Sequence, residues 1–187
     1  NNLPAHIAAA FGDSDNIPER QTLPTLSYRG KVWRLVLQGK ETILTRKDPD
    51  TGEPTPTPIV NVVVLDFHKK RGRAMYEGAY EEDKKTAPIC RSADGEKPDS
   101  DVKTPCAATC AACPNSVKGS KVSENGKATT ACTPYKMLAV VPSSKLDMEP
   151  LRLRLAQTSM WDKEATDQNA QGWYAWDQYV DFLRQHG

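Results

Sequence analysis

Five cysteines in 187 residues constrain this chain more than any other feature of its sequence. Cys110 and Cys113 form a Cys-x-x-Cys pair, which lets two thiolates reach one metal ion from a single tight turn. Such a pair needs two more distant ligands to complete a tetrahedral site. The spacing therefore predicts one structural zinc ion (Zn²⁺), held by Cys90, Cys110, Cys113 and Cys132.

The sequence leaves both the ligand set and the metal open to alternatives. Cys106 is the fifth cysteine, and its spacing would also allow it to replace Cys90. Thiolates suit an iron–sulfur cluster as well as zinc, and the thiols could instead be free. An odd number of cysteines crowded into one stretch does not fit a disulfide framework, so we expect a reducing cytoplasmic compartment.

The segment that carries all five cysteines, residues 87–134, is polar and shows little apolar periodicity. A loop of this length would be disordered without a cross-link, so we interpret it as a zinc-binding insertion. The length of the whole chain favours one domain over residues 1–187. No stretch approaches the roughly 20 consecutive apolar residues of a membrane span, and we expect no membrane partner.

The rest of the chain predicts a mainly β fold. Residues 28–37 are expected to form one strand with Trp33 on one face and Arg34 on the other. Residues 46–58 hold several prolines, which predict a flexible loop without regular structure. Further strands are predicted at residues 59–67, 74–80, 136–141 and 151–155.

Two connections complete the predicted architecture. The basic turn Lys69–Gly72 is expected to join the strands at 59–67 and 74–80 into a hairpin. Residues 164–187 are predicted to form a C-terminal helical segment that packs on the sheet. Its apolar residues recur at helical spacing, at Trp173, Trp176, Val180 and Leu183.

Catalysis is not expected. The sequence has no phosphate-binding loop, dinucleotide-binding turn or nucleophile elbow. A zinc deaminase would need a His-x-Glu element, and none of His6, His68 and His186 is followed by Glu two residues later. Four cysteine ligands would also leave no open position on zinc for a reactive water.

Several short motifs carry a resemblance: Pro88-Ile89-Cys90-Arg91-Ser92, Asp94-Gly95, Cys110-Ala111-Ala112-Cys113-Pro114-Asn115-Ser116, Gly119-Ser120, Cys132 and Leu153 to Ser159. Through them the chain resembles tailed-bacteriophage single-stranded DNA-binding proteins over roughly residues 58–187. The resemblance implies an OB-fold-like β-barrel, that is, an oligonucleotide-binding fold, with a cysteine-rich insertion and a C-terminal helix. It also implies single-stranded DNA as ligand, replication or recombination proteins as partners, and the host cytoplasm as location.

Sequence-tolerant binding of single-stranded DNA needs aromatic faces and a cationic groove on one surface. Residues 68–136 hold 13 basic and 9 acidic side chains, so the middle of the chain is its basic part. We expect base stacking from Trp33, Phe67, Tyr76 and Tyr80, and phosphate contacts from Arg34, Lys69, Lys70, Arg73, Arg152 and Arg154.

Other interpretations of these residues remain open. Trp33 and Phe67 also fit a buried core, and outward arginines often serve only to keep a protein soluble. A second hypothesis makes the chain a zinc-stapled protein-docking module of a phage replication or transcription complex. A third, an iron–sulfur redox protein, needs a cluster that absorbs visible light.

Overall fold

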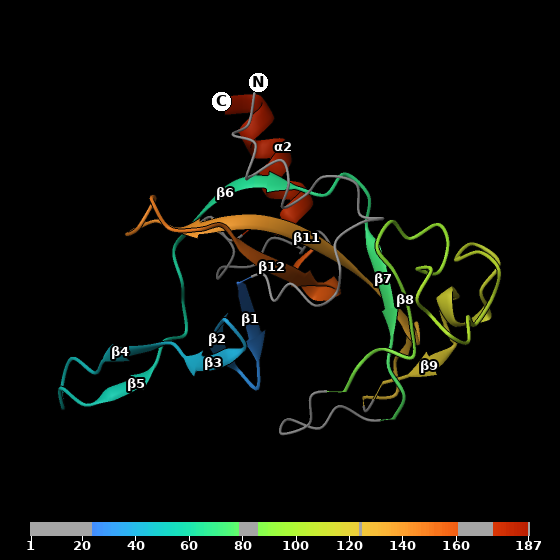
Figure 1. Cartoon of the computed structure of the whole chain (residues 1–187), viewed down its shortest axis with the longest axis horizontal. Coiled ribbons are helices and arrows are strands. Elements are labelled where there is room, and N and C mark those ends of the chain that lie inside the picture. The colour runs from blue at the N-terminus through green and yellow to red at the C-terminus, as the bar shows by residue number, and fades with distance from the viewer. Residues whose placement is uncertain (1–23, 79–85, 124, 161–173, 187) are drawn as a thin grey trace. The chain divides into compact units, whose positions relative to one another are not determined.

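The structure is a computed structural model that describes residues 24–78, 86–123, 125–160 and 174–186 (Figure 1). The described residues are mainly β with one C-terminal α-helix, which confirms the predicted fold class at this level. The chain divides into two compact units, which are described separately. Unit 1 comprises Asn1–Lys69, Glu77–Ala87 and Met137–Arg154, and unit 2 comprises Lys70–Tyr76, Pro88–Lys136 and Leu155–Gly187.

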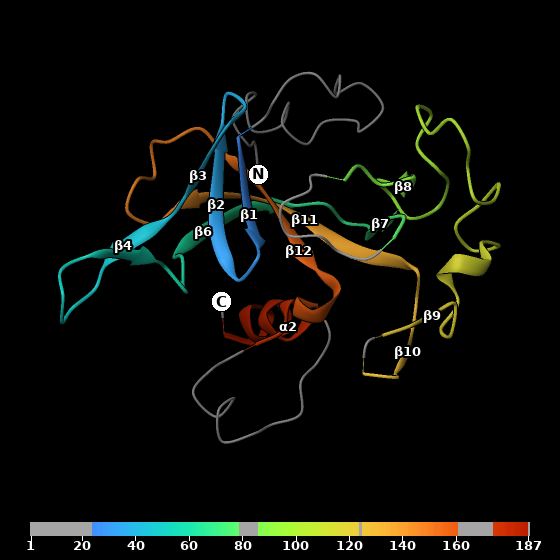
Figure 2. The same ribbon diagram turned by 90° about the horizontal axis from the view of Figure 1, so that it is seen from below.

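Unit 1 begins with an antiparallel meander of three strands, which lie side by side in both views (Figures 1 and 2). Two-residue turns, Gly30-Lys31 and Gln38-Gly39, connect them, and all four φ angles are positive at 60°, 60°, 49° and 80°. A type I′ hairpin turn requires positive φ at both central residues. The single strand predicted for residues 28–37 is therefore wrong, because the chain reverses at Gly30. The strands are β1 (Thr25–Arg29), β2 (Val32–Leu37) and β3 (Lys40–Ile43).

The proline-rich segment 46–58 was expected to lack regular structure, but most of it belongs to a hairpin of β4 (Thr45–Lys47) and β5 (Pro54–Pro56). The N–H of Thr57 donates to the carbonyl of Leu44, and the N–H of Asp48 donates to that of Glu53. Hydrogen-bonded pairs alternate along an antiparallel ladder, so Pro54 and Pro56 fall at the positions between them. A missing N–H is tolerated there, which explains why the prolines do not prevent pairing.

The core of unit 1 centres on β11 (Cys132–Pro142). Residues 138–141 of this strand are each at most 2% exposed, so both of its faces are buried. β6 (Val62–Phe67) pairs with it in antiparallel orientation, with a register shift between Ala139 and Val140. This irregularity puts Phe67 and Val63 on opposite faces, whereas strict alternation along the strand would place them on one face.

β12 (Leu151–Ala156) is the other neighbour of β11 and completes the apolar layer of unit 1. It pairs in parallel with β1, placing Leu153 opposite Leu26 and Arg152 opposite Thr25. Leu26, Leu151 and Leu153 are each at most 4% exposed. One face of this part of the sheet is therefore core, and the opposite face carries Arg152.

In unit 2, β7 (Gly72–Met75) lies between β11 and β8 (Cys90–Ser92) and pairs antiparallel with both. The chain after β8 forms a 3₁₀ helix, η1 (Pro114–Ser116), and the two-stranded pair β9 (Lys121–Val122) and β10 (Ala128–Thr129). A second 3₁₀ helix, η2 (Gln157–Ser159), precedes the α-helix α2 (Trp176–His186), which begins at a buried Trp176. Part of the predicted helical segment, residues 164–173, lies outside the described residues.

Three further observations bear on the expected architecture. β6 pairs with residues 138–142 of β11 and β7 with residues 132–135, so the hairpin predicted between these two strands is wrong. The strands of the described residues form no closed barrel. Within the described residues, no helix is both long and apolar enough to span a membrane.

Gly72 and Tyr135 are cross-strand partners, and the Tyr135 ring lies over Gly72 where a Cβ would overlap it. We expect Gly72→Ala to lower the free energy of unfolding by about 2 kcal/mol, because an added methyl group must displace a packed ring. Urea unfolding measures the effect. In a Tyr135→Ala background the same substitution should cost less than about 0.5 kcal/mol; an equal cost in both backgrounds would contradict this explanation.

Candidate functional site

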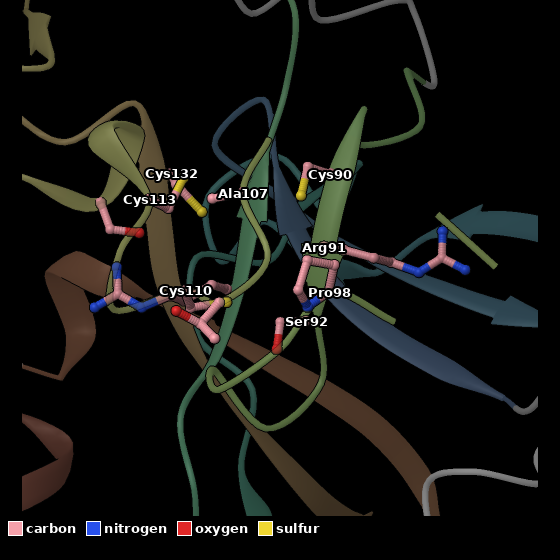
Figure 3. A pocket seen from close by; sticks show the side chains of 11 residues that line it. Cys90, Arg91, Ser92, Pro98, Ala107, Cys110, Cys113 and Cys132 are labelled. Carbon is pink, nitrogen blue, oxygen red and sulfur yellow. The ribbon is translucent and has the colours of Figure 1, made fainter. Parts of the chain in front are cut away.

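Four cysteines of unit 2 line one small cavity (Figure 3). Cys90 comes from β8, Cys132 from β11, and Cys110 and Cys113 from the loop that ends at η1. Each of the four is less than 9% exposed. The structure therefore brings the four sequence-predicted metal ligands together, although 41 residues lie between the first, Cys90, and the last, Cys132.

Strand pairing positions two of these cysteines. Met75 of β7 is the partner of both Cys90 and Cys132. Directly opposed residues of neighbouring strands share a face, so these three side chains form a row across three strands. Cys110 and Cys113 approach from the loop, where the N–H of Cys110 donates to the Glu96 carbonyl at 2.8 Å.

The fifth cysteine, Cys106, belongs to the same cluster. Its Sγ lies 3.7 Å from the Met75 Sδ, and its side chain is half-buried. Burial raises the pKa of the Cys106 thiol, and its hydrogen bond with Cys90 raises it further. All five thiols of the chain thus gather at one place, with Cys106 beside Cys90.

The electrostatic surroundings of the thiols are uneven. Burial raises the pKa of Cys132 to about 11, and the nearby Arg73 opposes this rise. Burial also raises the pKa of Cys110. A hydrogen bond with the Ser92 side chain and the charge of Arg73 both lower this pKa. Arg73 therefore favours the thiolate forms of Cys110 and Cys132.

The described residues contain no group of three or more His, Cys, Asp or Glu side chains arranged to hold a metal ion. The backbone brings the cysteines around one cavity, but their sulfur atoms do not already form a coordination shell. Metal binding would therefore require the side chains to rotate toward a common centre.

A loop braced by hydrogen bonds supports Cys90 and Cys110. Asp94 accepts hydrogen bonds from Ser92 Oγ and from the N–H of Glu96, at 3.0 and 2.8 Å. Burial acts to raise the pKa of Asp94, but these hydrogen bonds outweigh burial and lower it. Arg91 forms ion pairs with Asp99 and Asp101. The carboxylates of this loop are thus engaged in the local structure.

The basic turn that the sequence assigned to DNA is largely engaged within unit 2. Lys70 Nζ lies 2.7 Å from Glu96 Oε1, and Arg71 is ion-paired with Asp177 at the start of α2. Lys136 is buried near this second pair. Burial lowers the pKa of Lys136, as does the Arg71 charge, while Asp177 acts in the opposite direction. Lys69 is exposed and belongs to unit 1.

Arginines gather on one face of the unit 1 sheet, opposite the apolar core. Thr25 of β1 pairs with both Val36 and Arg152, and Ser27 pairs with Arg34, so both arginines point to the same side. Alternation along β12 adds Arg154 to that side. Arg29 and Arg34 share the carboxylate of Glu41, at 2.9 and 3.0 Å. We call this surface, made of Arg29, Arg34, Arg152 and Arg154 with Glu41, the arginine face.

The aromatic residues that the sequence selected do not lie on the arginine face of unit 1. Trp33 points to the other side of the sheet, where its ring pairs with Tyr28 at a centroid distance of 5.1 Å. Phe67, at the end of β6, is 38% exposed, and Tyr76, which follows β7 in unit 2, is 39% exposed. Tyr80 lies outside the described residues.

Sequence reasoning missed two features of the candidate site. The first is Tyr28, which is 55% exposed and pairs with Trp33 across a hairpin. A single strand over residues 28–37 hides this pairing, although Gly30 signals the turn. The position of Arg73 in the cysteine cavity was also missed, because it depends on the pairing of β7 with β8 and β11.

Comparison with known proteins finds no matching family model, no matching curated protein and no matching solved structure.

Proposed function

We propose that this protein binds single-stranded DNA without catalysis, with the arginine face of unit 1 as its phosphate-binding surface. The observation that carries the proposal is the strand register, which among the described residues places four arginines and one carboxylate, Glu41, on a single face of the sheet. Glu41 pairs with Arg29 and Arg34. Arginine is suited to this role because its guanidinium is always charged and donates to phosphate in a bidentate manner. Such contacts are sequence-independent, as a general single-strand binder requires.

Stacking on bases would come from the hairpin of β1 and β2. Tyr28 and Trp33 lie near its tip on the side opposite the arginines, and Lys31 is exposed in the turn. The indole N–H of Trp33 donates to the Pro58 carbonyl at 3.3 Å, which restricts the ring. A single strand of DNA that passes around the tip of the hairpin could stack a base on Tyr28 and place phosphates near the arginines on the opposite face. Restricted aromatic rings suit base stacking because little side-chain entropy is lost on binding.

We further propose that zinc is the structural metal of unit 2, with Cys90, Cys110, Cys113 and Cys132 as ligands. Their donor chemistry fits zinc, which prefers four thiolates in closed structural sites. Bound zinc would supply a cross-link between β8, β11 and the loop before η1. Cys106, the most exposed of the five thiols, is the residue left over.

The OB-fold-like barrel implied by the sequence resemblance stays part of this proposal. The meander of β1, β2 and β3 supports it, as does the parallel pairing of β12 with β1. The proposed DNA contacts need an open sheet face with arginines and do not depend on closure of a barrel.

A second candidate function, a zinc-stapled docking module, is favoured by an exposed aromatic column on unit 2. Tyr174 stacks on Phe182 at a centroid distance of 5.3 Å, and Phe182 stacks on His186 at 4.5 Å. Tyr174 and Phe182 are exposed. Exposed aromatic residues on a helix are typical of protein-binding surfaces, such as those of replication or transcription partners.

Replacement of single cysteines by serine tests the metal assignment. We expect one zinc per wild-type chain, and a loss of that zinc in Cys110→Ser and Cys113→Ser with a lower melting temperature, because metal binding stabilises the folded unit. Cys106→Ser is the matched control and should keep its zinc. Plasma emission spectrometry and thermal unfolding measure both effects. Unchanged metal content in the Cys110 and Cys113 variants would refute the assignment.

Titration of a fluorescent single-stranded oligonucleotide at several salt concentrations tests the DNA proposal. We expect salt-sensitive binding that prefers single strands to duplex. Arg34→Gln with Arg152→Gln should reduce the slope of log K against log salt by about 1.4, because each lost phosphate contact removes about 0.7. Lys145→Gln, which removes an exposed charge of the same unit, is the control.

Two results would count against this assignment. An unchanged slope in the double variant would clear the arginine face of phosphate contact. Negligible affinity at low salt for a protein that contains zinc would favour the docking module instead.

A further inference from the structure

Arg73, on β7 of unit 2, lies beside the cysteine cavity. It lines the cavity together with Cys90, Cys110, Cys113 and Cys132. On β7 it lies two residues before Met75, so both side chains leave the strand on the same face. Met75 is the cross-strand partner of Cys90 and Cys132, which places Arg73 on the cysteine-bearing face.

Arg91, the other cation that lines the cavity, has carboxylate partners in Asp99 and Asp101. Elsewhere in unit 2, Lys70 pairs with Glu96 and Arg71 with Asp177. Among the described residues no carboxylate is ion-paired with Arg73. Its charge is therefore available to act on the thiols beside it.

The charge balance of a metal centre explains why such a cation would lie here. Four thiolates around one divalent ion carry a net charge of about −2, which is costly in a buried site. A guanidinium cannot lose its proton in a protein, so Arg73 offers a permanent positive charge. Residues just outside a coordination shell that stabilise its ligands typically change metal affinity by about 10- to 100-fold.

We propose that Arg73 is a positioning residue of the cysteine centre, whose guanidinium offsets the negative charge of the metal-bound thiolates and raises metal affinity. The inference rests on the proposed zinc site. It gives Arg73 a role different from the phosphate contact that its sequence context suggested.

Competition for Zn²⁺ against a chromophoric chelator tests this role on the full chain. Arg73→Gln and Arg73→Met both remove the charge, and the methionine keeps the aliphatic length of the side chain. Arg73→Lys restores the charge, and Lys118→Gln removes an exposed charge elsewhere in unit 2. The absorption of Co²⁺-loaded protein reports whether four thiolates still surround the metal in each variant.

We expect the two neutral variants to bind Zn²⁺ about 10- to 100-fold more weakly, with the tetrathiolate Co²⁺ spectrum retained. Arg73→Lys should lie close to wild type, and Lys118→Gln should be unchanged. Unaltered Zn²⁺ affinity in both neutral variants would overturn the inference, as would a lysine variant no better than the methionine one. A reduced salt slope of DNA binding with normal Zn²⁺ affinity would return Arg73 to phosphate contact.

Zinc binding by the wild-type protein distinguishes a failure of the proposed zinc site from a failure of the role inferred for Arg73. If purified wild type neither contains zinc nor binds added Zn²⁺, the metal site itself fails and the inference falls with it. If wild type binds Zn²⁺ and the charge of Arg73 makes no difference, only the role of Arg73 is refuted.

Discussion

Half of the apolar side chains that the described part of unit 2 buries are thiols, and the proposed zinc site depends on this feature. Among the described residues, eight apolar side chains of unit 2 are buried, and four of them are the cysteines of the cavity; the others are Ala74, Met160, Ala175 and Trp176. Unit 1 has a conventional aliphatic core of Leu, Val and Ala. A polar chain with so small a core gains most from a cross-link, and the proposed zinc ion would provide one through metal-coupled folding.

The charges of unit 2 are consistent with the proposed zinc site. Buried thiols need cations close by if they are to ionise, and Arg73 lies among them while neighbouring cations pair with carboxylates. These ion pairs engage two residues of the basic turn that sequence alone assigned to DNA. The proposed phosphate contacts are therefore assigned to unit 1, where the arginine face carries four arginines and one carboxylate, Glu41, which pairs with Arg29 and Arg34.

Local sequence patterns predicted much of the secondary structure. The alternation in residues 151–155 gave β12, the helical spacing of the C-terminal segment gave α2, and the Cys-x-x-Cys pair marked the loop that meets Cys90 and Cys132. These predictions depend on residues that are neighbours in the chain or on strong chemical preferences, and such signals survive tertiary folding.

The features that sequence reasoning missed depend on long-range pairing. The order of β6 and β7 along the chain predicts a hairpin, but each strand pairs with a different part of β11. Arg71 meets Asp177 across 106 positions of the chain, a contact that no local pattern encodes. Pro54 and Pro56 predict an irregular loop, but their spacing of two residues fits the positions of an antiparallel ladder that need no N–H donor.

X-ray absorption at the zinc edge of the protein as purified, without added metal, identifies the metal and counts its ligands. A tetrathiolate site predicts one zinc per chain with four sulfur neighbours at about 2.3 Å and no nitrogen or oxygen ligand. A protein that contains no metal, or a shell with fewer than four sulfur atoms, would contradict the claim that the cysteines of unit 2 are organised around a single tetrathiolate zinc.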